Sequence, residues 1–86
     1  MTYSIEITRK AQKALSKIPG NYQDKIISTI HGLADEPFPP STKKLSGREA
    51  WRIRVGVYRI IYEVHQDVLS IVVVLVGHRK DIYRKS

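Results

Sequence analysis

The sequence predicts an α+β fold in a single domain spanning residues 1–86, with two helices on one face of a mostly antiparallel sheet. An alternating apolar and polar segment at residues 3–7 is typical of a first strand. Two segments with helical apolar spacing follow, and the second half alternates again or is continuously apolar. The predicted order is a strand, an antiparallel two-helix hairpin, an antiparallel meander of three strands and a short C-terminal tail or helix. The second face of the sheet should be free.

The first half carries recognisable helix signals. Thr8 offers a side-chain oxygen for the N-cap of the first helix, and Pro19-Gly20 should end that helix. Its apolar stripe consists of Ala11, Ala14, Leu15 and Ile18. Asn21 can cap the second helix, and the intervening turn is short enough to make the pair antiparallel. The second stripe consists of Tyr22, Ile26, Ile27, Ile30, Leu33 and Ala34.

The second half begins with a loop and continues with strands. Prolines at 37, 39 and 40 prevent a helix or a central strand, so residues 37–47 should form an exposed crossover loop. A hairpin is expected at residues 49–65. Residues 69–76 form the most apolar strand, which should lie inside the sheet beneath the helices. Residues 78–86 form a short basic tail.

Residues 51–62 hold the most informative pattern, because arginines alternate with large apolar residues on both sides of one glycine. Gly56-Val57 suits a two-residue hairpin turn. In that register Arg54 lies opposite Arg59, and Arg52 shares their face. The core face then receives Trp51, Ile53, Val55, Tyr58, Ile60 and Tyr62. Like charges that face each other across a strand pair cost stability, so this pattern indicates that an anion binds there.

The composition limits the possible partners and sites. A net charge of +7 favours a polyanionic or acidic partner, but charge alone does not distinguish RNA, DNA, an anionic membrane and an acidic protein. The absence of cysteine excludes disulfides and thiolate metal sites. Histidines and acids lack metal-ligand spacing, so we expect no metal and no cofactor. The start of the chain does not have the pattern of a signal peptide, and the apolar run at 71–76 is too short to span a bilayer, so we expect a cytoplasmic protein.

Candidate phosphate-binding residues gather between residues 43 and 59 and in the tail. They are Lys43, Lys44, Arg48, Arg52, Arg54, Arg59, Arg79 and Arg84. For proton transfer, Tyr83 could have its pKa lowered by surrounding arginines, and His78 has an intrinsic pKa near 6.5. The alternative roles are structural: Tyr83 as an aromatic packed over the sheet edge, and His78 as a turn residue at a strand end.

Taken together, these segments resemble the RelE toxins of the RelE/ParE toxin–antitoxin superfamily. The resemblance rests on Leu45-Ser46-Gly47, residues 51–62, Val76-Gly77-His78-Arg79, Tyr83 and the helix pair after a first strand. It implies the toxin of a type II system: a ribosome-dependent, metal-independent endoribonuclease that cleaves mRNA in the ribosomal A site. In the family mechanism, the ribose 2′-hydroxyl attacks its own 3′-phosphate. The resemblance also implies a RelB-like antitoxin, usually acidic, as partner.

The resemblance also implies roles for individual residues. Arg52 and Arg54 occupy positions where a well-studied type of RelE has two lysines. Arg59 and Arg79 match arginines that hold the phosphate, and Tyr83 matches a tyrosine proposed to act as base or to stack on the substrate. Because arginine does not readily lose a proton, the general base is expected to be Tyr83 or His78.

Two other interpretations stay open. A ParE-like toxin that poisons DNA gyrase would share the fold, although ParE relatives generally lack the arginine and tyrosine set kept here. The second is a non-catalytic nucleic-acid-binding module or an inactive toxin.

Overall fold

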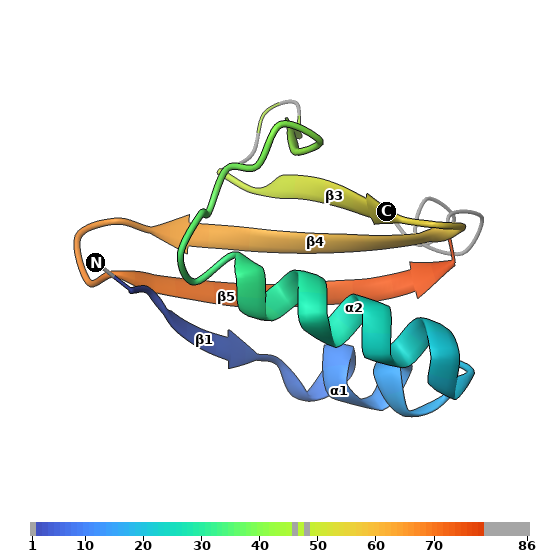
Figure 1. Ribbon diagram of the computed structural model, residues 1–86. Coiled ribbons are helices and arrows are strands. Elements are labelled where there is room, and N and C mark those ends of the chain that lie inside the picture. Colours follow the sequence, from blue (N-terminus) through green and yellow to red (C-terminus); the bar gives the residue numbers. More distant parts are fainter. Residues whose placement is uncertain (1, 46, 48, 79–86) are drawn as a thin grey trace.

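The computed structural model of the chain describes residues 2–45, 47 and 49–78. Its elements are β1 (Ser4–Ile7), α1 (Arg9–Ser16), α2 (Gly20–Gly32), β2 (Lys43–Lys44), β3 (Trp51–Val55), β4 (Tyr58–His65) and β5 (Ser70–His78) (Figure 1). The predicted α+β class and the order of strand, two helices and further strands are confirmed. The structure adds one short strand, β2, within the segment predicted to be a loop.

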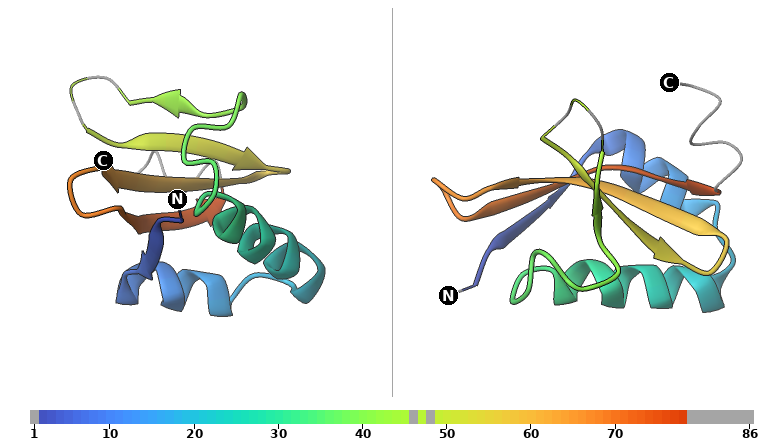
Figure 2. Two further views of the ribbon diagram at one scale, coloured as in Figure 1. Left: turned by 60° about the vertical axis from the view of Figure 1, so that its left-hand side comes forward. Right: turned by 90° about the horizontal axis from the view of Figure 1, so that it is seen from above.

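The strands form one sheet in the order β1-β5-β4-β3-β2. β1 runs parallel to β5, and the other neighbours are antiparallel, as the sequence predicts for most of the sheet. β5 lies between β1 and β4, in agreement with the inner position expected of its apolar sequence. The sheet is twisted, and the two helices run in opposite directions beside it (Figures 1 and 2).

A single core fills the space between the helices and the sheet. α1 contacts β5 and α2 contacts β3. The fully buried side chains include Ile26 and Ile30 of α2 and Tyr62 of β4. Ile27 does not join them: it is 36% exposed, so the second helical stripe is narrower than predicted.

Thr8 connects the start of α1 to an irregularity in β5. Its hydroxyl accepts a hydrogen bond from the Ala11 amide at 3.2 Å, which confirms the predicted N-cap, and donates one to the Val74 carbonyl at 3.0 Å. Val74 is the extra residue of a bulge, because Ile61 of β4 pairs with Leu75 whereas Tyr62 pairs with Val73. The cap therefore also holds the bulge in place.

The start of α2 differs from the prediction. Pro19, not Asn21, is the N-cap, and the helix begins at Gly20 without a side-chain cap. The Pro19 carbonyl accepts the Gln23 amide at 2.8 Å, so the chain enters the helix directly after the proline. The Gln23 side chain then donates to the Leu15 carbonyl at 2.8 Å and satisfies the end of α1.

Substituting Thr8 tests the connection between the cap and the bulge. Thr8→Ala removes both hydrogen bonds and should lower the free energy of unfolding by about 1–2 kcal/mol. Thr8→Ser keeps the hydroxyl and should lose much less. Denaturant unfolding of both variants provides the measurement, and equal losses would show that the methyl group matters, not the hydroxyl.

Candidate functional site

The hairpin between β3 and β4 has the predicted register. Val55 pairs with Tyr58 across the turn, and Arg54 pairs with Arg59. Gly56 has a φ of 59°, which suits the first central position of a two-residue turn. A Cβ on Gly56 would lie 3.0 Å from Cε1 of Tyr22, so any other residue here would also press against the Tyr22 ring of α2.

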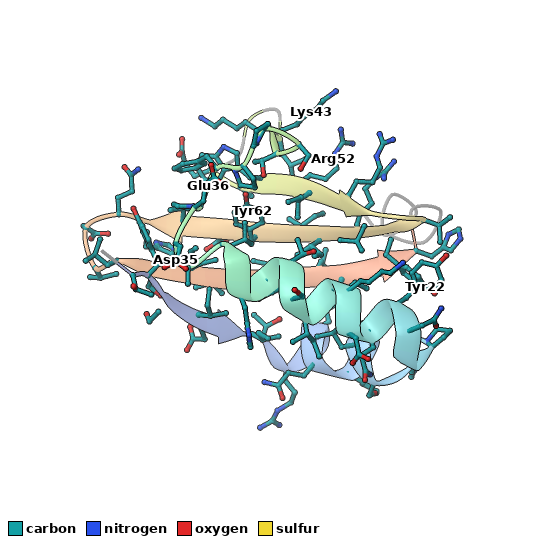
Figure 3. The ribbon with its side chains drawn as sticks, in the orientation of Figure 1. Tyr22, Asp35, Glu36, Lys43, Arg52 and Tyr62 are labelled. Carbon is teal, nitrogen blue, oxygen red and sulfur yellow. The ribbon has the colours of Figure 1, made fainter. Side chains whose placement is uncertain are left out.

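Four cations from three strands share the sheet face opposite the core, which we call the arginine face: Lys43, Arg52, Arg54 and Arg59. Lys43 of β2 pairs with Arg52 of β3, so β2 adds a cation beside the hairpin. Successive residues on one face of a strand are about 7 Å apart, so the two pairs form adjacent rows. Arg52 and Lys43 lie at the β2 side of the sheet in Figure 3.

The two paired arginines differ in exposure. Arg54 is exposed, whereas Arg59 is only 7% exposed. A guanidinium keeps its charge when buried, and water screens that charge less than on the surface. The neighbour of Arg59 on β5 is Gly77, which has no side chain to extend over the arginine pair. The arginine face therefore combines a buried cation with an exposed one, an arrangement suited to an anion with several oxygens.

Part of this sheet face is covered, contrary to the prediction that it would be free. Ile61, in the row next to Arg59, is 4% exposed and packs with Ala50, Leu45 and Leu75. Leu45 and Ala50 come from the segment between β2 and β3, and the Leu45 amide donates to the Ala50 carbonyl at 2.9 Å. This small apolar cluster lies next to the cations, so the strands that carry them are packed on both faces of the sheet.

The loop before β2 is fixed by a buried phenol. The Tyr62 hydroxyl donates to the Pro37 carbonyl at 2.7 Å and shares a hydrogen bond of 2.9 Å with the Thr42 hydroxyl. Burial raises the pKa of Tyr62 above its usual 10.0, although the hydrogen bond from Thr42 acts in the opposite direction. Thr42 directly precedes Lys43, so Tyr62 helps to position a residue of the arginine face. The sequence placed Tyr62 in the core but contained no signal for its loop partners.

Lys44 and His78 lie apart from the arginine face. Lys44 pairs with Trp51, its ammonium lies 5.8 Å from the Trp51 ring centroid, and it forms an ion pair with Glu49 at 3.3 Å. His78 pairs with Tyr58, on the side that faces the helices, and the two ring centroids are 6.0 Å apart. Tyr58 in turn packs against Tyr22 of α2.

The bulge explains the position of His78. Residues of β5 that face the core are Ile71 and Val73 before the bulge, and Val76 and His78 after it. Without the bulge, the register of Tyr62 and Val73 would continue to Arg59 and Val76, and His78 would lie on the arginine face. The bulge instead pairs Arg59 with Gly77 and turns His78 to the core side. The structure thus separates His78 from the arginines with which it was grouped.

Four of the predicted site residues, Arg48, Arg79, Tyr83 and Arg84, lie outside the described residues. Within the described part, no group of three or more histidines, cysteines or acids could hold a metal ion. No helix of that part is long and apolar enough to cross a membrane.

Acidic groups occupy the opposite end of the strands. Glu63 lies 3.0 Å from the His65 ring, and a hollow of about 540 Å³ beside them is also lined by Glu49 and Asp67. These carboxylates would repel a phosphate, so the end of the sheet near the hairpin turn is electrostatically the more favourable one for an anion.

The comparisons with known proteins agree with this architecture. The model of a family described as "ParE toxin of type II toxin-antitoxin system, parDE" matches residues 5–83. Toxin RelG of Mycobacterium tuberculosis is 30% identical and covers 99% of this chain and 100% of its own. A chain of the archaeal RelE–RelB complex from Pyrococcus horikoshii superposes with a TM-score of 0.83, at 29% identity, over 92% of this chain and 97% of its own. A chain of the RelB–RelE antitoxin–toxin complex from Methanococcus jannaschii gives a TM-score of 0.77, at 31% identity, over 93% of this chain and 96% of its own.

This chain belongs to the RelE/ParE superfamily of toxins from type II toxin–antitoxin systems. The resemblance inferred from the sequence is confirmed, and so is the fold that it implied.

Removing the Tyr62 hydroxyl tests the loop anchor. Tyr62→Phe should lower the free energy of unfolding by about 1–3 kcal/mol because it leaves the Pro37 carbonyl without its donor. Thr42→Val removes only the second hydrogen bond and should lower the free energy of unfolding by less.

The pH dependence gives a second test. An unfolded tyrosine ionises near pH 10, whereas folded Tyr62 stays neutral to higher pH, so the contribution of its hydroxyl to stability is complete below pH 10 and is lost above it. Urea unfolding between pH 7 and 11 should show the difference between wild type and Tyr62→Phe shrinking above pH 10. A constant difference would contradict the raised pKa.

Neutralising one paired arginine tests the repulsion across the hairpin. Arg54→Gln should leave the free energy of unfolding unchanged or raise it by up to about 0.5 kcal/mol, since the like-charge pair with Arg59 is removed. Low ionic strength should enlarge the gain because salt screens the repulsion. Clear destabilisation at every salt concentration would mean that the two guanidinium groups do not oppose each other.

Proposed function

We propose that this toxin is a ribosome-dependent endoribonuclease that cleaves mRNA in the A site and thereby inhibits translation. The observation that carries the proposal is the pairing of Arg54 with Arg59 on a sheet face that also holds Arg52 and Lys43. In the free protein, the repulsion between these like charges lowers the stability. When a phosphodiester lies between them, both guanidinium groups can bind its oxygens.

The proposed reaction is an internal transesterification of the RNA backbone. A base takes the proton of the ribose 2′-hydroxyl, and the 2′-oxygen attacks the adjacent phosphorus while the bond from phosphorus to the 5′-oxygen breaks. An acid gives a proton to the leaving 5′-oxygen, so the products are a cyclic phosphate and a 5′-hydroxyl. Negative charge builds up on the non-bridging oxygens of the pentavalent transition state, and fixed guanidinium groups stabilise it more than the ground state. DNA lacks the nucleophile, so the substrate is RNA.

Proton transfer is assigned to residues outside the arginine pair, because a guanidinium does not act as a base at neutral pH. By the family resemblance, Tyr83 is the first candidate. The position of His78 against Tyr58, on the side that faces the helices, makes it the weaker one. Arg79 is assigned to the phosphate beside Arg59 by the same resemblance.

Family membership supports a proposal for the partner and the location. The Pyrococcus and Methanococcus relatives were crystallised as complexes with RelB. We propose that a RelB-like antitoxin of acidic character binds this toxin, whose net charge is +7, and keeps it inactive. Ribosomes and mRNA place its action in the cytoplasm.

Gyrase poisoning is the second candidate, because the matching family description names ParE. It differs in its target and not in its fold. The RelE and RelG relatives and the arginine face favour RNA cleavage, and one experiment separates the two activities.

Mapping of mRNA ends after induced expression tests the proposal. New 5′ ends should appear at A-site codons within translated frames, and the purified toxin should cut mRNA only when ribosomes are present. Arg54→Gln and Tyr83→Phe should each slow cleavage about 100-fold or more, the loss typical for one transition-state contact. Lys25→Gln, on α2, is the matched control for charge removal and should cleave like the wild type.

Two results would reject the proposal. Intact mRNA together with inhibited DNA supercoiling would establish the gyrase target. Intact mRNA with no effect on gyrase would indicate a binding module or an inactive toxin.

A further inference from the structure

A second basic surface lies on α1, away from the arginine face. It consists of Arg9, Lys10, Lys13 and Lys17, all exposed, and we call it the α1 basic surface. No acidic residue occurs between positions 7 and 23, so these charges have no carboxylate neighbour along their own segment. The surface carries four of the fifteen lysines and arginines of the chain.

Two of these cations are placed against the helix dipole, and all four have like-charged neighbours. Arg9 and Lys10 occupy the first turn of α1, where the positive end of the helix dipole disfavours cations, and that turn has no acidic residue. Lys13 follows Arg9 by four positions and Lys10 by three, and Lys17 follows Lys13 by four. Like charges at these spacings are neighbours on the helix surface and repel. As in the arginine face, cations that repel one another are held close together, which suits an anionic partner.

The chemistry of α1 favours a phosphate backbone over a protein. The apolar side of α1 is not available to a partner, because Ala11 and Leu15 are buried in the core. The exposed side offers only polar groups, with Gln12 and Ser16 beside the cations. Protein interfaces have an apolar centre and are depleted in lysine, whereas lysine, arginine, serine and glutamine are the usual contacts to nucleic-acid phosphates.

The two basic surfaces cannot serve the same short stretch of RNA. α1 packs its buried side against β5 on the core face of the sheet, and the arginine face is the opposite one. Figures 1 and 2 show α1 at the β1 end of the molecule, with β2 and β3 at the other end. A strand that reaches Arg54 and Arg59 therefore leaves α1 available for a second polyanion.

We propose that the α1 basic surface binds the phosphate backbone of ribosomal RNA while the arginine face holds the mRNA. This inference rests on the proposed ribosome-dependent function and assigns the dependence to named residues. Affinity for the ribosome and cleavage chemistry then belong to different sides of the molecule.

Binding to vacant ribosomes, without mRNA, isolates the α1 contribution. The triple variant Lys10→Gln, Lys13→Gln, Lys17→Gln should bind at least about tenfold more weakly near 0.1 M salt. In a plot of log affinity against log salt concentration, its slope should be less steep than that of the wild type by about two. The corresponding triple arginine variant keeps the charges and should bind like the wild type. Lys25→Gln, compared with Lys13→Gln alone, is a matched single change on the other helix and should have no effect.

Cleavage measured at saturating toxin completes the test. The triple glutamine variant should reach the wild-type maximal rate once enough toxin is added. Its thermal stability should change little, because relief of the repulsion offsets the lost interaction of Lys13 with the C-terminal end of the helix dipole. Unchanged ribosome affinity and salt dependence would overturn the inference. Loss of antitoxin affinity with ribosome affinity intact would assign the surface to an acidic protein and also overturn it. If the wild type binds ribosomes through α1 yet never cuts mRNA, the α1 inference stands and the proposed function fails.

Discussion

The two-residue turn at Gly56 and Val57 determines which side of the sheet each residue of β3 and β4 occupies. Once Val55 pairs with Tyr58, period-two alternation directs the large apolar residues to the helices and the arginines to the opposite face. A shift of one residue would expose the core and bury the charges. Burial of Ile53, Ile60 and Tyr62 thus stabilises the register that holds Arg54 and Arg59 opposite each other.

The same division between stability and charge is seen elsewhere in the molecule. The packed core stabilises the fold, whereas the exposed sides carry closely spaced cations whose repulsion lowers the free energy of unfolding. Tyr62 joins the two roles, since its ring is buried while its hydroxyl fixes the loop that brings Lys43 to the arginine face. On α1, Ala11 and Leu15 anchor a helix whose outer side is entirely polar and mostly cationic. A small domain with one core can therefore present two basic surfaces facing different directions.

Local patterns made much of this fold predictable, whereas long-range pairings did not. The register of the arginine hairpin and the Thr8 cap depend on neighbours in sequence, and both were predicted correctly. β2 was missed because a two-residue strand has no periodicity. The position of His78 depends on the Val74 bulge, and a continuously apolar strand gives no sign of where one extra residue is inserted. The four cations of the arginine face were all predicted candidates. Only the structure shows that Lys44, also a candidate, lies on the other face.

Arginine side-chain NMR during titration with a short RNA tests the central claim most directly. The RNA carries a 2′-O-methyl group at the cleavage position, so it binds without being cut. We expect the Nε–Hε signals of Arg54 and Arg59 to shift together and to saturate at one RNA concentration, because a single phosphate contacts both. In Arg54→Gln the shift of Arg59 should require a higher RNA concentration. Signals of Arg54 and Arg59 that stay unchanged while the protein binds the RNA would contradict a phosphate site on this face.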